Sequence, residues 1–436
     1  MKLSRTLSFM GIAALGAGAV NAETLTVGTV NNNDMIIMQG LTSEFEKAHP
    51  DIDLEWVVLE ENVLRQRLTT DIATNGGQFD VMTIGTYEVP IWAKQGWLVE
   101  LDDLPDDYAK EDLLESVRDG LSHDGTLHAL PFYGESSMMY YRKDLFEQAG
   151  IKMPEQPSWE QVRDWASQLH DPDNDVYGIC LRGKPGWGEN MALVSTMVNT
   201  FGGRWFDMEW NPQLDSAAWQ EAVGFYVDLL NDYGPPGASS NGFNENQALF
   251  SSGKCGIWVD ATSAAGRIYD SQESKIADQL GFAPAPVAKT PKGSHWLWSW
   301  ALAIPASSDS KEDAKEFITW ATSQEYIKLV GEKEGWTSVP PGTRESTYAN
   351  ENYQQAAPFA DFVLQAMQSA DPTDSTLEPS PYVGVQFVGI PEFQSIGTQV
   401  GQMVAAALTG ERTVEQALQA AQRSTERTMQ RAGYMD

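Results

Sequence analysis

Thr24-Leu-Thr-Val-Gly-Thr-Val30 is the stretch from which the fold can be worked out, because it has the pattern of a strand and opens a regular alternation. The elements expected after it are a helix over 35–49, a strand over 53–59, a helix over 63–75 and a strand over 80–84. Strands and helices that alternate with short links are typical of a mostly parallel α/β sheet. Because ligands bind beyond the carboxyl ends of such strands, we expect Asn33, Asp34 and Tyr87 at the ligand edge.

The first residues predict export. Lys2 and Arg5 form a short positive region, and an apolar run over 9–20 follows it. Val20-Asn-Ala22 then has the residue sizes that a signal peptidase recognises, and the run is too short to span a membrane. We expect a signal peptide over 1–22 and a mature protein free in the periplasm, since no cysteine stands at the cleavage point to carry a lipid.

Size and charge narrow the class of protein. Loss of the first 22 of 436 residues leaves 414, too many for one hydrophobic core, so we expect two domains. The formal net charge of −32 becomes −34 when the two basic residues of the leader are lost. Such a charge repels nucleic acid and anionic lipid, and it keeps an exported protein dispersed. We therefore expect no nucleic-acid partner.

The two cysteines, Cys180 and Cys255, each lie in a short apolar run with the pattern of a strand. An oxidising compartment permits a disulfide between them. Buried free thiols are the expectation, because a domain of this size needs no covalent link and free cysteine packs as a small apolar residue.

Catalytic and metal-binding motifs are absent from the sequence. It has no Walker loop, no GxGxxG, no HExxH and no GxSxG motif, and its five histidines lack the spacing of metal ligands. The acidic run Asp171-Pro-Asp-Asn-Asp175 is not a calcium loop, because Val176 and Arg182 stand where glycine and glutamate are needed. We expect no metal, no cofactor and no catalysis. A secreted glycosidase with two carboxylates stays an alternative.

Seven short motifs occur in a fixed order along almost the whole mature chain. They are Leu41-Thr-Ser-Glu-Phe-Glu-Lys47, Phe79-Asp-Val-Met82, Lys94-Gln-Gly-Trp-Leu98, Tyr140-Tyr-Arg-Lys-Asp-Leu145, Asn246-Gln-Ala-Leu-Phe250 with Gly253-Lys-Cys-Gly-Ile-Trp258, Ala301-Leu-Ala-Ile-Pro305 and Asp313-Ala-Lys-Glu-Phe-Ile318. In this order they resemble the bacterial extracellular solute-binding proteins of ABC sugar importers. Residues 81–87, 131–136 and 178–183 resemble most the sorbitol- and mannitol-binding branch of that family.

The resemblance implies an α/β fold of two doubly wound lobes joined by hinge segments, as in periplasmic binding proteins of type II. One lobe would take residues 23–134 and 300–345, and the other residues 135–299 and 346–436. Closure about the hinge would bury the ligand, and a membrane permease would receive it from the closed monomer. The implied ligand is a small neutral polyol such as mannitol or sorbitol, with a mono- or oligosaccharide as the alternative.

A polyol presents rows of hydroxyls with apolar C–H faces between them. Its site therefore needs aromatic side chains and polar groups that make two hydrogen bonds at once. Asn33, Asp34 and Tyr87 are candidates by their position after strands, with capping of the next helix as the alternative role. Glu135 is a candidate because it matches a ligand-contacting acid of the family.

The remaining candidates come from the second half of the chain. Arg182 follows an apolar strand, and Trp187 and Asn190 lie where the next helix begins. Asp260 ends another strand, where a lone buried acid would need partners. Trp296, Trp298 and Trp300 alternate with other residues and so share one face, and we expect Trp298 to face the cleft. Trp336 is a further candidate. Trp187 and the alternating tryptophans have core packing as their alternative role.

Overall fold

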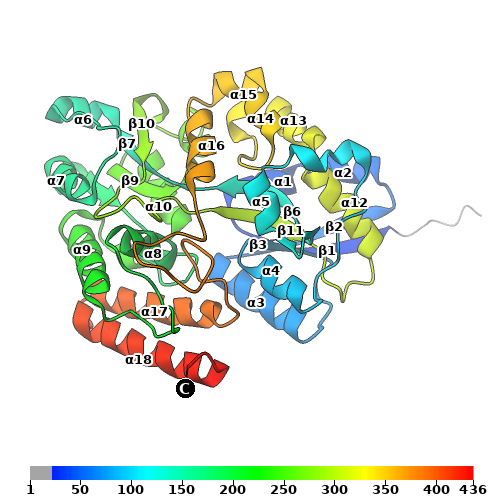
Figure 1. Cartoon of the computed structure of the whole chain (residues 1–436). Coiled ribbons are helices and arrows are strands. Elements are labelled where there is room, and N and C mark those ends of the chain that lie inside the picture. Colours follow the sequence, from blue (N-terminus) through cyan, green and yellow to red (C-terminus); the bar gives the residue numbers. More distant parts are fainter. Residues whose placement is uncertain (1–21, 436) are drawn as a thin grey trace, which may run out of the picture.

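The computed structural model describes residues 22–435, which form two lobes side by side, each built around its own sheet (Figure 1). In the first lobe the strand order is β2-β1-β3-β11-β6. Strand β1 (Glu23–Val30) pairs in parallel with β2 (Ile52–Leu59) and β3 (Val81–Gly85). Strand β11 (Trp298–Ala303) runs antiparallel between β3 and β6 (Leu130–Glu135). The predicted strands of the first lobe are confirmed.

The helices of the first lobe follow the predicted alternation with one difference. The helix expected over 35–49 is two helices that meet at Leu41, because Gly40 weakens the helix at this point. The helices of the lobe are α1 (Asn33–Gly40), α2 (Thr42–Ala48), α3 (Glu61–Ala73), α4 (Glu88–Lys94), α5 (Glu115–Gly120), α12 (Lys311–Ala321) and α13 (Gln324–Lys333), and a small hairpin joins β4 (Ser122–His123) to β5 (Thr126–Leu127).

The second lobe has a four-stranded sheet in the order β10-β7-β9-β8. Strand β7 (Ser137–Arg142) runs antiparallel to β10 (Leu280–Pro284) and β9 (Cys255–Ala261), and β8 (Tyr177–Cys180) pairs in parallel with β9. The helices between β7 and β10 are α6 (Lys143–Ala149), α7 (Trp159–Leu169), α8 (Asn190–Thr200), α9 (Ala217–Tyr233), α10 (Phe243–Ser251) and α11 (Ala265–Ile268). After the chain has passed again through the first lobe, it forms α14 (Glu345–Ala349), α15 (Glu351–Ala356), α16 (Ala360–Ser369), α17 (Phe393–Leu408) and α18 (Val414–Ala432).

The chain crosses between the two sheets in two places. It passes from β6 to β7 between Glu135 and Ser137, and it returns between Pro284 and Trp298. Glu135 therefore ends its strand at the first crossing. The complete division of the chain into two lobes stays a prediction, because no strand flanks the expected boundary at 345/346.

The two cysteines form a disulfide, so the expectation of free thiols was wrong. Cys180 and Cys255 are bonded with their Cα atoms 5.9 Å apart, which is an ordinary separation for a bridge. Both lie on neighbouring parallel strands and are completely buried. Each strand is apolar because it is buried, but its own sequence does not show that the two strands are adjacent.

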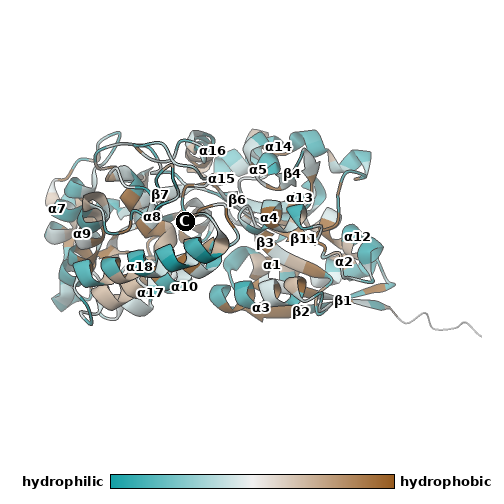
Figure 2. Cartoon of the chain, turned by 60° about the horizontal axis from the view of Figure 1, so that its bottom comes forward, coloured by the Kyte–Doolittle hydropathy of each residue, from teal (hydrophilic) through white to brown (hydrophobic). Residues whose placement is uncertain are grey.

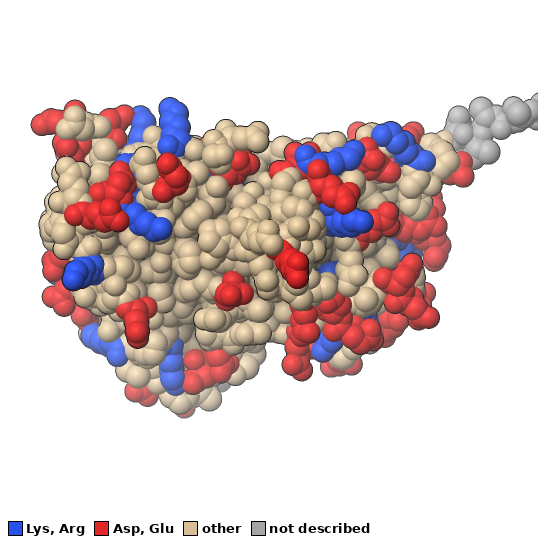
Figure 3. Space-filling model, turned by 90° about the horizontal axis from the view of Figure 1, so that it is seen from above, with Lys and Arg blue, Asp and Glu red and all other residues tan. Residues whose placement is uncertain are grey.

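Apolar residues fill the interior of both lobes, and polar residues lie outside (Figure 2). Helix α18 illustrates this: Leu418, Ala421 and Met429 are buried while its other face is polar. Acidic side chains are spread over both lobes on the face drawn in Figure 3, as the net charge of −32 requires. No helix within residues 22–435 is both long and apolar enough to cross a membrane. The predicted signal peptide lies, apart from Ala22, outside the described residues.

Candidate functional site

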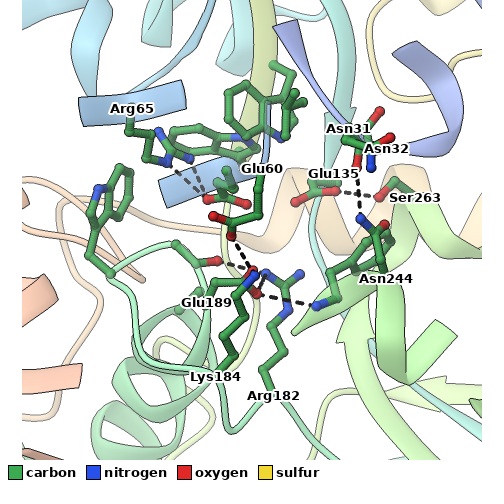
Figure 4. A pocket seen from close by; sticks show the side chains of 18 of the residues that line it. Asn31, Asn32, Glu60, Arg65, Glu135, Arg182, Lys184, Glu189, Asn244 and Ser263 are labelled. Atoms are coloured by element: carbon green, nitrogen blue, oxygen red, sulfur yellow. Dashed lines mark hydrogen bonds and ion pairs between the residues drawn. The ribbon is translucent and has the colours of Figure 1, made fainter. Parts of the chain in front are cut away.

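A cavity of about 140 Å³ lies between the two lobes and is lined by side chains of both (Figure 4). The first lobe contributes residues that follow β1, the first turn of α3, and strands β6 and β11. The second contributes the segment after β8, the start of α10, and single residues from other segments. The lining residues are Val30, Asn31, Asn32, Glu60, Glu61, Arg65, Tyr133, Glu135, Arg182, Lys184, Trp187, Gly188, Glu189, Ala192, Phe243, Asn244, Glu245, Ser263, Trp296, Trp298, Trp300 and Gln386.

Four of the ten candidates from the sequence line this cavity: Glu135, Arg182, Trp187 and Trp298. All four are buried, and they come from three separate segments of the chain. The expectation that Trp298 faces the cleft agrees with this placement, and its neighbours Trp296 and Trp300 line the cavity as well. The alternating residues Trp296, Trp298 and Trp300 thus form an aromatic wall of the cavity.

Arg182 is held by Asp260 from behind the cavity. Its Nη2 lies 2.6 Å from the Asp260 carboxylate, its Nε donates to the same carboxylate at 3.0 Å, and its Nη1 donates to the carbonyl of Gly188 at 2.7 Å. Burial opposes the charge of Arg182, but the carboxylate of Asp260, together with the charges of Glu189 and Glu61, outweighs burial and raises the pKa of the guanidinium. Asp260 does not line the cavity, so its place is that of a support for Arg182.

Glu135 is an acid that carries little charge at neutral pH. Its Oε2 accepts a hydrogen bond of 2.5 Å from the hydroxyl of Ser263, a residue of the other lobe (Figure 4). Burial raises the pKa of Glu135 from 4.5 to about 8, although the bond from Ser263 and the charge of Arg182 oppose that rise. A protonated carboxyl can both donate and accept a hydrogen bond, which suits a hydroxyl.

The opposite side of the cavity carries a chain of charges. Lys184 lies 2.5 Å from Glu60 of the first lobe and 3.6 Å from Glu189 of its own lobe. Burial raises the pKa of Glu189 to about 7, and the nearby charge of Glu61 adds to this rise. The three basic side chains that line the cavity, Arg65, Arg182 and Lys184, are therefore each paired with a carboxylate and leave no free cation to bind an anionic ligand.

The aromatic wall surrounds a second arginine. The guanidinium of Arg65 lies 4.0 Å from the ring centre of Trp187, 4.9 Å from that of Trp298 and 4.6 Å from that of Trp300. Trp298 can lie against β3 only because residue 85 is glycine: a Cβ there would overlap its ring. The sequence analysis missed Arg65, since a charged residue in a predicted helix gives no sign of burial.

Several other lining residues were also missed. Asn32 and Tyr133 are hydrogen-bonded at 2.8 Å, with the amide of Asn32 as donor, so the Tyr133 hydroxyl keeps its own proton for a further acceptor. Asn31 and Asn32 immediately precede the predicted Asn33 and Asp34, so the residues after β1 that line the cavity lie within two positions of the predicted ones. Lys184, Glu189, Asn244 and Gln386 have no distinguishing pattern in the sequence.

Six candidates do not line the cavity. Tyr87 hydrogen-bonds the carbonyl of Ile390 at 3.0 Å, and Asn190 donates to the carbonyl of Gly401 at 2.9 Å; both are buried links behind the aromatic wall. Asn33 and Asp34 line a narrow crevice beside it, and Trp336 lines a separate hollow together with residues of α13, α14 and α15. Asp260 is the sixth. The helix-capping role falls to Asn32, whose side chain accepts from the amide of Met35.

Contacts between the lobes close the cavity on several sides. Besides the ion pair of Glu60 with Lys184, the amide of Asn244 donates to the carbonyl of Asn31 at 2.8 Å, and that of Asn62 donates to the carbonyl of Pro185 at 3.2 Å. The structure is therefore the closed form. No cluster of His, Cys, Asp and Glu within residues 22–435 is arranged to hold a metal ion.

Comparison with known proteins places the chain in a family. Residues 31–328 match the model of the bacterial extracellular solute-binding proteins. The chain belongs to this family. It is 62% identical over 421 residues to the mannitol-binding protein of Pseudomonas aeruginosa, which covers 97% of this chain and 96% of the relative. The family predicted from the sequence motifs is thus confirmed.

Solved structures agree with this assignment. An ABC transporter solute-binding protein of Agrobacterium vitis S4 with bound D-mannitol has a TM-score of 0.93 at 61% identity, over 94% of this chain and 99% of that one. A solute-binding protein of Agrobacterium radiobacter K84 in complex with ribitol has a TM-score of 0.82 at 23% identity, over 94% and 99%, and shows the shared fold. The predicted fold class is confirmed.

Proposed function

We propose that this protein is the solute-binding component of an ABC importer and that its solute is mannitol or a closely similar hexitol. The observation that carries the proposal is the closed cavity of about 140 Å³, in which polar groups of both lobes lie opposite an indole wall. The 62% identity to a mannitol-binding protein over nearly the full chain supports the same ligand class. A membrane permease would receive the hexitol from the closed form.

The chemistry of the cavity suits a neutral polyol. Glu135 with its raised pKa and the hydroxyl of Tyr133 can each donate a proton, while the second oxygen of Glu135 can accept one. Arg182 supplies charged N–H donors that Asp260 and the Gly188 carbonyl fix in direction. Indole faces cover the C–H groups between hydroxyls. These groups offer both donors and acceptors to the hydroxyls of a polyol.

The closed geometry argues against an oligosaccharide. A longer ligand would have to leave the cavity through the contacts that close it, namely the Glu60–Lys184 ion pair and the bond from Asn244 to Asn31. Breaking those contacts would hold the lobes apart. A small ligand that fits inside allows all of them to form.

The proposal includes two further points. The protein catalyses no reaction, because its relatives are binding proteins. It acts in the periplasm after removal of residues 1–22, so the mature N-terminus is Glu23. An intact mass that retains the leader, or product released from a test glycoside, would contradict these points.

Titration calorimetry on protein freed of ligand by unfolding and refolding tests the proposal. Mannitol, sorbitol, glucose, maltose and inositol form the ligand set. We expect mannitol to bind with a Kd of about 1 μM or tighter, because a captured nutrient needs roughly −8 kcal/mol. Binding of maltose without binding of the hexitols would reject the polyol assignment.

A further inference from the structure

We propose that Arg65 is a positioning residue that latches the two lobes together, so that its contact with Trp187 sets how long the closed form lasts. The proposal rests on the proposed function, because closure of the two lobes is the step that retains the solute. It assigns to Arg65 an effect on closure that is present even when no ligand is bound.

Arg65 is held in place by the first lobe alone. Its Nη1 lies 2.5 Å from Glu88, and its Nε donates to Glu61 at 3.0 Å, one turn earlier in α3. Burial opposes its charge, but Glu88 and Glu61 outweigh burial and raise its pKa. Trp298 and Trp300 of β11 cover its guanidinium. The cation is therefore oriented before the second lobe arrives.

The nearest ring to Arg65 belongs to the other lobe. Trp187 follows β8, and its ring centre lies 4.0 Å from the guanidinium, closer than either first-lobe indole. The Trp187 ring is buried and also meets Tyr87 at 4.9 Å and Trp298 at 5.7 Å. A cation held over an indole with both groups desolvated is a favourable contact that exists only when the lobes meet.

The segment that carries Trp187 is shaped to dock on α3. A Cβ on Gly188 would overlap the carboxylate of Glu61, and one on Gly186 would overlap the amide of Asn62. Only glycine lets the backbone come this close to the first turn of the helix. Trp187 is thus presented to Arg65 between two glycines that fit the same surface.

Cross-linking at a contact that contains neither Arg65 nor Trp187 tests the latch without ligand. Thr69, one turn after Arg65 in α3, and Gln394 contact each other across the lobes at 3.0 Å. The variant Thr69→Cys/Gln394→Cys carries the only free thiols, because both native cysteines are in the disulfide. A short bis-methanethiosulfonate reagent then joins the two lobes at a rate proportional to the time spent closed.

On that background Arg65→Lys keeps the positive charge beside Glu61 and Glu88 but loses the planar group over the indoles. We expect cross-linking in the absence of ligand to slow about tenfold. The matched control is Arg67→Lys on the exposed face of the same helix, which should leave the rate unchanged. Trp187→Phe tests the same contact from the other lobe and applies even where Arg65→Lys folds poorly.

The double variant Arg65→Lys/Trp187→Phe should be no slower than the slower single variant, because both remove one contact. Equal ligand-free rates in Arg65→Lys, Trp187→Phe and the Arg67→Lys control would overturn the latch and leave Arg65 as a wall of the cavity only. A Thr69→Cys/Gln394→Cys protein with native Arg65 and Trp187 that cross-links at the expected rate but binds no hexitol would contradict the ligand assignment and not the latch.

Discussion

Closure of the lobes should take up a proton at Glu135. The ordinary pKa of a hydrated glutamate is 4.5, whereas burial in the closed form raises the pKa of Glu135 to about 8. Between these values the open form is ionised at Glu135 and the closed form is protonated. Linkage then requires that rising pH disfavours closing, and hence binding, throughout this window.

The size of the effect follows from the two pKa values. At pH 6 the open form is almost fully ionised and the closed form almost fully protonated at this residue, so binding takes up about one proton there. Proton uptake at Glu135 raises the Kd for the ligand by at most about tenfold for each pH unit between pH 4.5 and 8. Glu135→Gln keeps the shape and removes the titration, so it should show about one proton less.

Calorimetry of mannitol binding at pH 6, in two buffers with different ionisation enthalpies, measures the proton uptake directly. Burial raises the pKa of Glu189 in the same direction, but that residue is present in both proteins and cancels in the difference. Equal uptake by the wild type and Glu135→Gln would refute the reasoning, because it would mean that Glu135 stays ionised in the closed complex.

Four other outcomes are expected. Cys180→Ala/Cys255→Ala should lower the free energy of unfolding by about 4 kcal/mol, since the bridge closes a loop of 75 residues, and denaturation with urea measures it; a change below 1 kcal/mol would show that the bridge is incidental. Asp260→Ala should destabilise the fold by about 3–5 kcal/mol because Arg182 stays buried and keeps only the more distant carboxylate of Glu189, 3.8 Å away, and an unaltered melting curve would contradict this. Gly85→Ala should weaken hexitol binding at least tenfold by displacing the Trp298 ring, and Gly40→Ala, where a methyl group meets nothing, is its control; the same Kd in both would disprove the packing argument. Lys184→Ala should weaken binding less than fivefold, because the partly exposed ion pair with Glu60 is worth about 1 kcal/mol or less; a loss of a hundredfold in the titration would mean that Lys184 contacts the ligand.

Local patterns were enough to predict the first three strands. These strands depend on residues that are neighbours in sequence, such as the apolar run of β3. The prediction of a single helix over 35–49 was wrong, because the sequence does not show whether one glycine within a helical pattern ends the helix.

Contacts between distant segments could not be predicted in the same way. The pairing of β8 with β9 brings Cys180 to Cys255, and nothing within either strand records it. Asp260 was expected to face the ligand because burial of an acid needs partners, but Asp260 is buried and its partner is Arg182, which was taken for a second ligand contact. Arg65 and Glu189 look like ordinary surface charges until both lobes are in place.

The molecule retained by the purified protein tests the central claim most directly. Native mass spectrometry of protein recovered from cells grown on mannitol should show one hexitol bound to each chain, and mild unfolding should release it. An oligosaccharide at the same stoichiometry, or a charged solute, would contradict the claim that this closed cavity is built for a small neutral polyol.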